Sequence, residues 1–483
     1  MRNLLILFFL FGCSTLLGQI TFYKQFSNNG YDYGEGITQM ADSSYFITGS
    51  SSSFFEGPAQ AFILKLDSLG NFKWSKHFGG SESDGGKRIM HIENDGLLVA
   101  GFTNSSGLGA YDFYLFKTDL NGFLLWENTY GTSSWDRVYD AALTRDSGVI
   151  MVGETLNTTD GESDILIVRT DKNGNELWSQ QIGNEGADLI SCISQINDST
   201  FALGGKVFVA DSMMHKAYIC KMDENGIIWW EDTLDLEGNS QLNGICYSDP
   251  KIACVGETQF LNDEIYPINY KCDLLGVPEI NSVIPVIPVN KLKGITNFGN
   301  TSWYAVAMSY DNQYSYGGYD LDIQQYYPSL DYEESLGEVH SAQNVFYGQI
   351  GSTNDDGAVM VGHFENIGLG GSNVFVMKIN KDVPGFNPST ILNFESLVDV
   401  DEFENEVNAT IFPNPANVEF SIKTEINSLA QIVIQDFSGR IIYSEDLVVT
   451  SKIDVRNFAA GSYFVTVSIE NEPIIYKKLV IAK

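Results

Sequence analysis

Four aspartates recur at a fixed interval along the first half of the chain and are its best candidates for binding chemistry. Asp32, Asp84, Asp136 and Asp188 are each 52 residues apart. Converging carboxylates hold Ca²⁺ or orient a sugar. The alternative is that each aspartate accepts backbone N–H bonds and locks its own turn. Regular repetition favours the alternative, because binding sites usually break symmetry.

No other residues form a recognisable catalytic set. The histidines have no metal-ligand spacing, and there is no G-x-S-x-G motif, P-loop or dinucleotide-binding fingerprint. We therefore assign no catalytic residue and expect no cofactor other than Ca²⁺. The histidines are His77, His91, His215, His340 and His363.

A second set of candidates lies in connections that differ from one repeat to the next. Phe54 and Phe55 lie in one such connection, and Met213 and Met214 lie in another. Exposed apolar side chains of this kind stack on sugar rings or dock a partner protein. Equally, they pack against the edge of the fold. Loops on a rigid scaffold are where we expect a ligand site.

These candidates are positioned by a repeat whose clearest copy is DKNGNELW, Asp171–Trp178. A period near 50 with strand-like residues between the marks predicts a β-propeller with four antiparallel strands in each blade. Seven units of about 52 residues fill residues 20–385, with six or eight open because the sixth unit is weak. The repeating marks are Asp67, Asp119, Asp171 and Asp223; Gly70, Gly122, Gly174 and Gly226; Trp74, Trp126, Trp178 and Trp230; and, in the second strand, Gly49, Gly101, Gly153 and Gly205.

The two ends of the repeat array complement each other. Phe22 lies 52 residues before Trp74, so TFYKQF aligns with a fourth strand that lacks the first three. The seventh unit lacks its outer strand. We therefore expect the N-terminal segment to complete the last blade and close the ring.

Composition and the N-terminal residues indicate an exported protein. The chain has 62 acidic and 28 basic residues, a net charge of −34, which argues against a nucleic-acid or anionic-membrane partner. Residues 1–18 are typical of a signal peptide, with lipoprotein processing at Cys13 as the alternative, and no later segment predicts a transmembrane helix. Cys246 and Cys254 flank a turn and form either a disulfide or two buried thiols.

The C-terminal part has a different composition. Residues 386–408 are an acidic linker, and residues 409–483 alternate apolar and polar residues as in a β-sandwich. The domain resembles the type A C-terminal sorting domain of the type IX secretion system of Bacteroidetes. The resemblance implies that the secretion machinery reads residues 409–483, and that the product is released or attached to the cell surface. The matching motifs are FPNPA (Phe412–Ala416), DFSGR (Asp436–Arg440), AAGSYFV (Ala459–Val465) and KKLVIAK (Lys477–Lys483).

The D-x-x-G-x-x-x-W repeat also resembles the tryptophan-docking motif of quinoprotein propellers. The resemblance implies that each indole packs between two blades. It does not extend to the quinone site, because those enzymes have adjacent cysteines and this chain has none.

The sequence thus favours an all-β, secreted or cell-surface binding protein with a glycan or protein ligand, and not an enzyme. One alternative is an extracellular polysaccharide hydrolase or lyase, which requires converging carboxylates from unlike blades. The other is a structural or adhesive protein without a saturable site for a small ligand.

Overall fold

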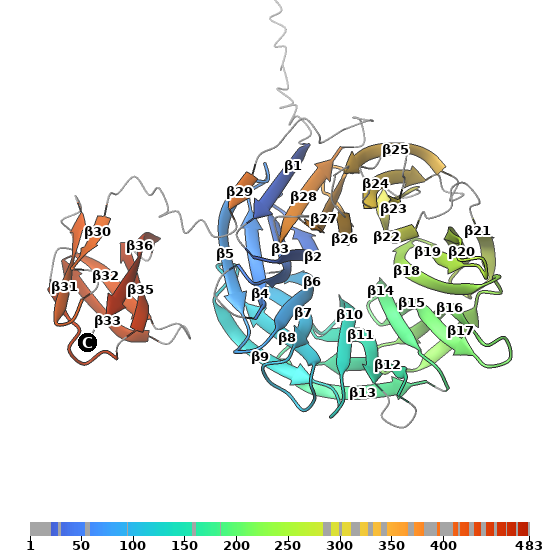
Figure 1. The fold of residues 1–483 in the computed structure, drawn as a ribbon, viewed down its shortest axis with the longest axis horizontal. Coiled ribbons are helices and arrows are strands. Elements are labelled where there is room, and N and C mark those ends of the chain that lie inside the picture. Colours follow the sequence, from blue (N-terminus) through green and yellow to red (C-terminus); the bar gives the residue numbers. More distant parts are fainter. Residues whose placement is uncertain are drawn as a thin grey trace, which may run out of the picture. The chain divides into compact units, whose positions relative to one another are not determined.

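Seven sheets of mainly antiparallel strands stand around a common centre in the computed structural model, as the repeat predicts (Figure 1). The turn that joins the third strand to the fourth requires glycine: Gly70 donates its N–H to Asp67 O at 3.0 Å and has φ +77°. The bounds of the first four blades, from inner to outer strand, are β2 (Asp32–Gln39), β3 (Tyr45–Ser51), β4 (Gln60–Leu66), β5 (Phe72–Phe78); β6 (Asp84–Ile92), β7 (Gly96–Thr103), β8 (Asp112–Thr118), β9 (Leu124–Tyr130); β10 (Asp136–Leu143), β11 (Val149–Leu156), β12 (Ser163–Thr170), β13 (Glu176–Ile182); and β14 (Leu189–Asn197), β15 (Thr200–Val209), β16 (Met214–Asp223), β17 (Ile228–Thr233).

The remaining three blades follow in chain order. The seventh takes one outer strand from the N-terminal segment, Phe22–Ser27, and another from Phe394–Ser396. The bounds of these three blades are β18 (Asn239–Ser248), β19 (Lys251–Gln259), β20 (Ile265–Asp273), β21 (Pro278–Val283); β22 (Lys291–Phe298), β23 (Ser302–Tyr310), β24 (Tyr319–Tyr326), β25 (Tyr332–Val339); and β26 (Val345–Ser352), β27 (Ala358–Glu365), β28 (Ser372–Ile379), β1 (Phe22–Ser27), β29 (Phe394–Ser396).

The structure describes most of the repeat region and shorter stretches elsewhere. The described residues are 21–27, 30–53, 58–93, 95–156, 161–183, 185–283, 291–298, 302–310, 319–326, 332–339, 345–365, 371–380, 394–396, 409–413, 416–424, 429–435, 441–448, 452–459, 461–469 and 472–481. The predicted signal peptide, Cys13 and His340 lie outside them.

Three of the repeating tryptophans, Trp74, Trp126 and Trp230, pack against the turn glycine of the next blade. A Cβ atom at Gly122 would lie 2.8 Å from the Trp74 ring, and one at Gly174 would lie 2.5 Å from the Trp126 ring. Trp230 donates its indole N–H to Leu274 O of the following blade at 3.0 Å. The packing of the indoles between blades is therefore confirmed.

The N-terminal strand closes the ring. β1 pairs antiparallel with β28, with Phe22 opposite Lys378. Phe22 packs on Gly70 of the first blade, where a Cβ atom would lie 2.6 Å from its ring, and makes an edge contact with Tyr45 at 5.6 Å between centroids. Phe22 thus occupies the place of the docking tryptophan, as its spacing predicts.

One further strand lies within the segment that the sequence assigns to the linker, residues 386–408. β29 pairs parallel with β1, with Gln25 opposite Phe394. A strand of three residues is too short to produce a periodic pattern in the sequence. The seventh sheet therefore has five strands.

The C-terminal unit, Val398–Lys483, contains two sheets. Its buried core includes Phe420, Ile432, Val465 and Leu479, in agreement with the predicted β-sandwich. The strands are β30 (Ala409–Phe412), β31 (Glu419–Thr424) and β34 (Lys452–Asp454) in one sheet, and β33 (Ile441–Val448), β32 (Leu429–Gln435), β35 (Gly461–Ile469) and β36 (Glu472–Ile481) in the other.

The disulfide alternative for Cys246 and Cys254 is wrong. All five cysteines that follow residue 18 are free and buried. Cys246 pairs with Ala253, so Cys254 is one residue out of register and its side chain lies on the opposite face of the sheet. Cys246 packs with Trp303, whereas Cys254 packs with Tyr270.

Removing the Phe22 ring should weaken the closed ring. Phe22→Ala is expected to lower the free energy of unfolding by about 3 kcal/mol, because it leaves a cavity between the last blade and the first. The matched control Leu125→Ala, at a side chain 55% exposed, is expected to change it by less than about 0.5 kcal/mol. Urea denaturation measures both, and equal effects would contradict the closure.

Candidate functional site

The four repeating aspartates begin, or directly precede, the inner strands of four different blades. All four are buried. Asp84 accepts hydrogen bonds from Thr103, from Ser105 Oγ at 2.8 Å and from Gly80 N at 2.8 Å. Asp32 accepts from Ser51 and Ser53 in the same way. These carboxylates join the connection between blades to the end of the second strand.

The two later aspartates have similar partners. Asp136 accepts from Thr132 N at 2.6 Å, and Asp188 accepts from Phe208 N at 2.6 Å. In the described part of the chain, no group of three or more His, Cys, Asp or Glu side chains is placed to hold a metal ion. These contacts have the geometry expected of turn-locking aspartates.

The loop candidates fall in two places. Phe54 and Phe55 lie outside the described residues. Met213 is at the tip of the hairpin that joins β15 to β16, 74% exposed and with φ 53°. Met214 is partly buried and pairs with Val209 across the hairpin.

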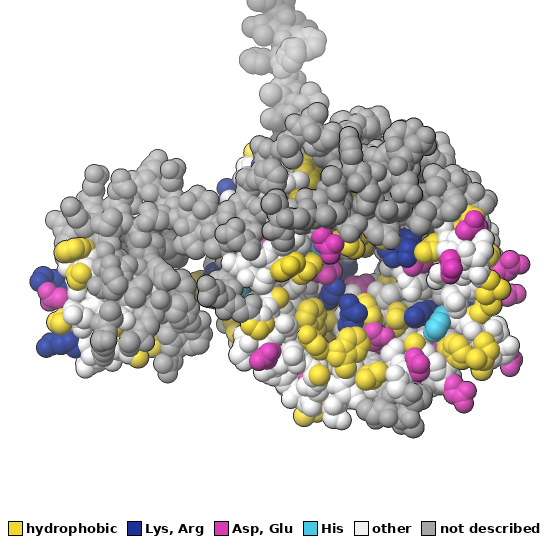
Figure 2. All heavy atoms as spheres, in the orientation of Figure 1, with side chains coloured by type: hydrophobic (Ala, Val, Ile, Leu, Met, Phe, Trp, Pro, Cys, Tyr) yellow, Lys and Arg dark blue, Asp and Glu magenta, His cyan; other side chains and the backbone are white. Residues whose placement is uncertain are grey.

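A cavity of about 690 Å³ lies at the centre of the ring and is lined by the inner strands of all seven blades. Figure 2 shows the hollow, with both basic and acidic side chains around it. The lining is mostly polar. A concave site of this volume suits a small ligand or part of a polymer.

Each inner strand carries a β-bulge at the equivalent place, and the bulge inserts one residue opposite the second strand. A bulge of this kind redirects a side chain and is common beside functional sites. The inserted residues, called the bulge residues below, are Glu35, Lys87, Tyr139, Ser191, Asn243, Lys293 and Gly348.

The repeating glycine of the second strand permits the bulge. A Cβ atom at Gly49 would lie 1.8 Å from Tyr33 O, and one at Gly101 would lie 1.9 Å from Gly85 O. Glu35 lies 14 residues before Gly49, and the same interval separates Lys87 from Gly101. The bulge residues were not predicted from the sequence, although these glycines mark where they occur.

The positions around the bulge repeat, whereas the bulge residues differ. Two positions after the bulge, six blades have a buried isoleucine and the third has Ala141. These isoleucines are Ile37, Ile89, Ile193, Ile245, Ile295 and Ile350. The bulge residues therefore break the sevenfold regularity of the inner strands, as the residues of a binding site usually do.

Two consecutive cations of the second blade pair with carboxylates of the first and third blades. Lys87 Nζ lies 2.7 Å from Glu35 Oε1 of the first blade, and Arg88 Nε lies 3.5 Å from Asp140 Oδ1 of the third. Burial raises the pKa of Asp140, while Arg88 and the N–H of Ile193, at 3.1 Å, oppose the rise. Carboxylates from unlike blades thus line one cavity, each paired with a cation.

Comparison with known proteins identifies the C-terminal unit. Residues 410–482 match the family model described as the secretion system C-terminal sorting domain. The chain therefore combines a seven-bladed propeller with the sorting domain of a type IX secretion cargo protein. None of the described residues forms a helix long and apolar enough to cross a membrane.

The propeller itself is similar to solved structures only in fold. The WD40 domain of Pan2 from Neurospora crassa is 11% identical, with a TM-score of 0.43 over 74% of this chain and 98% of that one. The propeller domain of the Trilobed protease from Pyrococcus furiosus is 9% identical, with a TM-score of 0.45 over 73% and 94%. A family PL25 ulvan lyase is 8% identical, with a TM-score of 0.48 over 74% and 96%. No curated protein matches the chain in sequence.

The role of the buried aspartates can be tested with Asp84→Ala. The variant should lower the free energy of unfolding by about 1–3 kcal/mol, because it leaves the donors of Gly80 and Ser105 without their acceptor. The loss should be the same in Ca²⁺ and in EDTA when thermal unfolding is followed. A rise in the wild-type Tm with Ca²⁺ that Asp84→Ala removes would instead indicate a calcium site.

Proposed function

Because the chain is a propeller that carries an export signal at residues 410–482, we propose that it is an extracellular binding protein whose central cavity takes a glycan. One observation carries the proposal. Six of the seven inner strands repeat the buried isoleucine and all seven repeat the bulge, yet the six bulge residues that line the cavity are of six different types.

The cavity wall has the groups that carbohydrate binding requires. Tyr139, Ser191 and Asn243 supply a phenol, a hydroxyl and an amide from three successive blades. Charged groups on neighbouring blades add Glu35 and Lys87. Sugar hydroxyls are both donors and acceptors, so a mixed polar wall on a rigid scaffold orients them.

A purely structural role for the bulge residues is the competing explanation. Ser191 Oγ donates to Leu242 O at 2.5 Å, and Asn243 Nδ2 donates to Leu292 O at 2.8 Å, each reaching the next blade. These two side chains join inner strands. Lys87 is different, since its partner is a charged side chain that also borders the cavity.

A glycan-array screen followed by calorimetry tests the proposal on the chain without residues 1–18. Lys87→Gln should weaken binding of a glycan hit by about tenfold, because it removes a charged donor from the cavity wall. The control Met213→Ser, at the exposed hairpin tip, should leave the affinity within about twofold. Weaker binding by Met213→Ser, with the affinity of Lys87→Gln unchanged, would place the site on the loops. The absence of any saturable hit from a folded sample would overturn the proposal and favour the structural or adhesive role.

A polysaccharide hydrolase or lyase is the second candidate. The observation in its favour is that Glu35 and Asp140, from the first and third blades, line the same cavity. A raised pKa suits a general acid, and burial raises that of Asp140.

The enzymatic candidate makes a prediction that binding alone does not. If the protein cleaves a glycan that it binds, new reducing ends should accumulate, and Asp140→Asn should reduce their release by at least about 100-fold. The Tm should change little. A bound glycan that stays intact over prolonged incubation would exclude this candidate for that glycan.

A further inference from the structure

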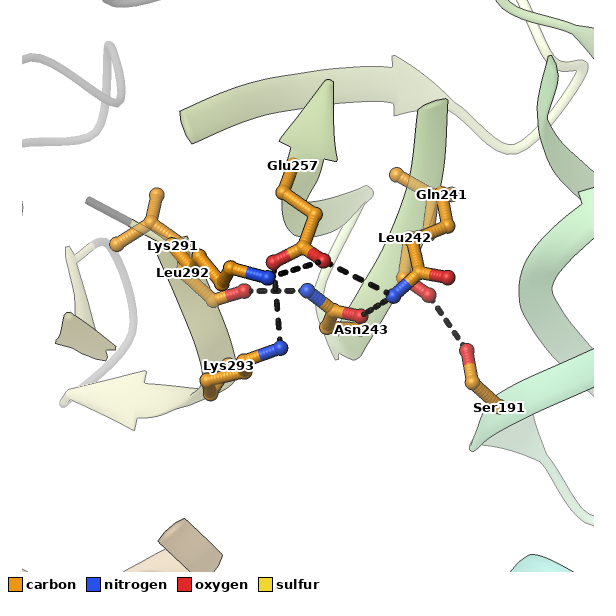
Figure 3. A network of polar contacts seen from close by, with 8 residues as sticks. All are labelled: Ser191, Gln241, Leu242, Asn243, Glu257, Lys291, Leu292 and Lys293. Carbon is orange, nitrogen blue, oxygen red and sulfur yellow. Dashed lines mark hydrogen bonds and ion pairs between the residues drawn. The ribbon is translucent and has the colours of Figure 1, made fainter. Parts of the chain in front are cut away.

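Two lysines of the sixth blade share one carboxylate of the fifth (Figure 3). Lys291 Nζ lies 3.2 Å from Glu257 Oε1, and Lys293 Nζ lies 3.2 Å from Glu257 Oε2. Lys293 is the bulge residue of the sixth blade, and Glu257 lies on the second strand of the fifth. The group carries two positive charges and one negative charge.

The excess positive charge is partly removed from water. The side chains of Lys291, Lys293 and Glu257 are only 21%, 22% and 14% exposed. Burial lowers the pKa of Lys293, and the charge of Lys291 adds to this effect while Glu257 opposes it. Like charges held together away from solvent are costly, and an added anion would relieve the cost.

The neighbouring side chains hold this arrangement in place and contribute a further donor. Gln241 Nε2 lies 3.3 Å from Glu257 Oε1 and 2.9 Å from Asn243 Oδ1. Asn243 Nδ2 donates to Leu292 O, between the two lysines, at 2.8 Å. The groups that surround the carboxylate are thus two ammonium groups and an amide N–H, which is the donor set that an oxyanion requires.

The net charge of this cluster is opposite in sign to that of the whole protein. The chain as a whole has a net charge of −34, which repels anionic ligands at long range. Asn243 and Gly294, the neighbours of the lysines in space and in sequence, line the central cavity. An anion that enters the cavity therefore meets a local excess of positive charge beside it.

We propose that the Lys291–Glu257–Lys293 cluster binds the oxyanion group of an acidic polysaccharide, a carboxylate or a sulfate, whose sugar rings occupy the central cavity. The inference rests on the proposed function and names the ligand class. Glu257 occupies the place of the oxyanion in the free protein and keeps the lysines apart from other anions. The bound oxyanion takes one donor from each lysine.

The fifth blade supplies a matched control. Lys251 and Lys271 also share one carboxylate, that of Glu279, and lie on the three outer strands of the blade. Neither these three residues nor their chain neighbours line the central cavity, whereas Gly294, next to Lys293, does; the Glu279 side chain is 37% exposed. The control cluster has the same charges but no cavity beside it.

Two variants with opposite expected effects test the proposal. Lys293→Gln should weaken binding of an acidic polysaccharide by about tenfold, because it removes one of the two cations. Glu257→Gln should tighten binding by several-fold, because it removes the competing carboxylate. A structural cluster predicts instead that both changes weaken binding. The controls Lys271→Gln and Glu279→Gln should stay within about twofold of the wild type.

The measurement is calorimetry of the folded chain at physiological salt with four probes: polygalacturonate, chondroitin sulfate, neutral dextran and inorganic sulfate. Binding of either acidic polymer with the opposite responses of the two variants supports the proposal, and the two polymers distinguish carboxylate from sulfate. Binding of dextran alone overturns it but retains the glycan-binding function. Binding of inorganic sulfate alone, or equal loss in the control cluster, overturns it as non-specific attraction. Binding of none overturns both proposals for these ligand classes.

Discussion

The packing of one aromatic ring against one glycine turn determines the rest of this molecule. Trp74, Trp126 and Trp230 each lie on the turn glycine of the following blade, and Phe22 does the same across the junction of the last blade with the first. The turn can accept the ring only because it has no Cβ atom there. Such contacts fix the angle between blades, and β1 then completes the seventh sheet by pairing with β28 and closes the ring.

The closed ring brings seven inner strands together, and their bulges determine what borders the centre. The second-strand glycines let the backbone of the inner strand approach closely, so that one inserted residue per blade is redirected. The buried isoleucines next to the bulges hold the strands in register. On this regular scaffold, different bulge residues stand at equivalent places of successive blades. The result is a polar cavity with side chains of different charge on successive blades.

Much of the fold could be predicted from the sequence, because the D-x-x-G-x-x-x-W spacing marks the same turn in the first four blades and reflects a contact between neighbouring blades. The closure by Phe22 followed from the same interval. The strand β29 could not be predicted, because three residues carry no period, and the disulfide hypothesis failed because one residue of register places Cys246 and Cys254 on opposite faces. The repeating Asp84 and its equivalents are regular because each accepts hydrogen bonds in its own blade or the connection before it.

The polar cavity was harder to predict, because its lining residues differ from blade to blade. Lys293 and Asn243 are unlike residues at equivalent places, so no repeated letter marks them, and their relation appears only when the bulge of each strand is aligned. The glycine opposite each bulge was the available signal in six blades. In the sixth blade Ala307 stands at that place, which is one reason why that unit was hard to recognise.

The central claim is that the ligand enters the ring centre and contacts the inner strands. Hydrogen–deuterium exchange of the full ring with and without a bound acidic oligosaccharide tests this claim most directly. The expected result is slower exchange in β18 (Asn239–Ser248) and β22 (Lys291–Phe298), with no change in the outer strand β21 (Pro278–Val283). Slower exchange confined to the hairpin between β15 and β16 would contradict the claim and place the ligand on the loops.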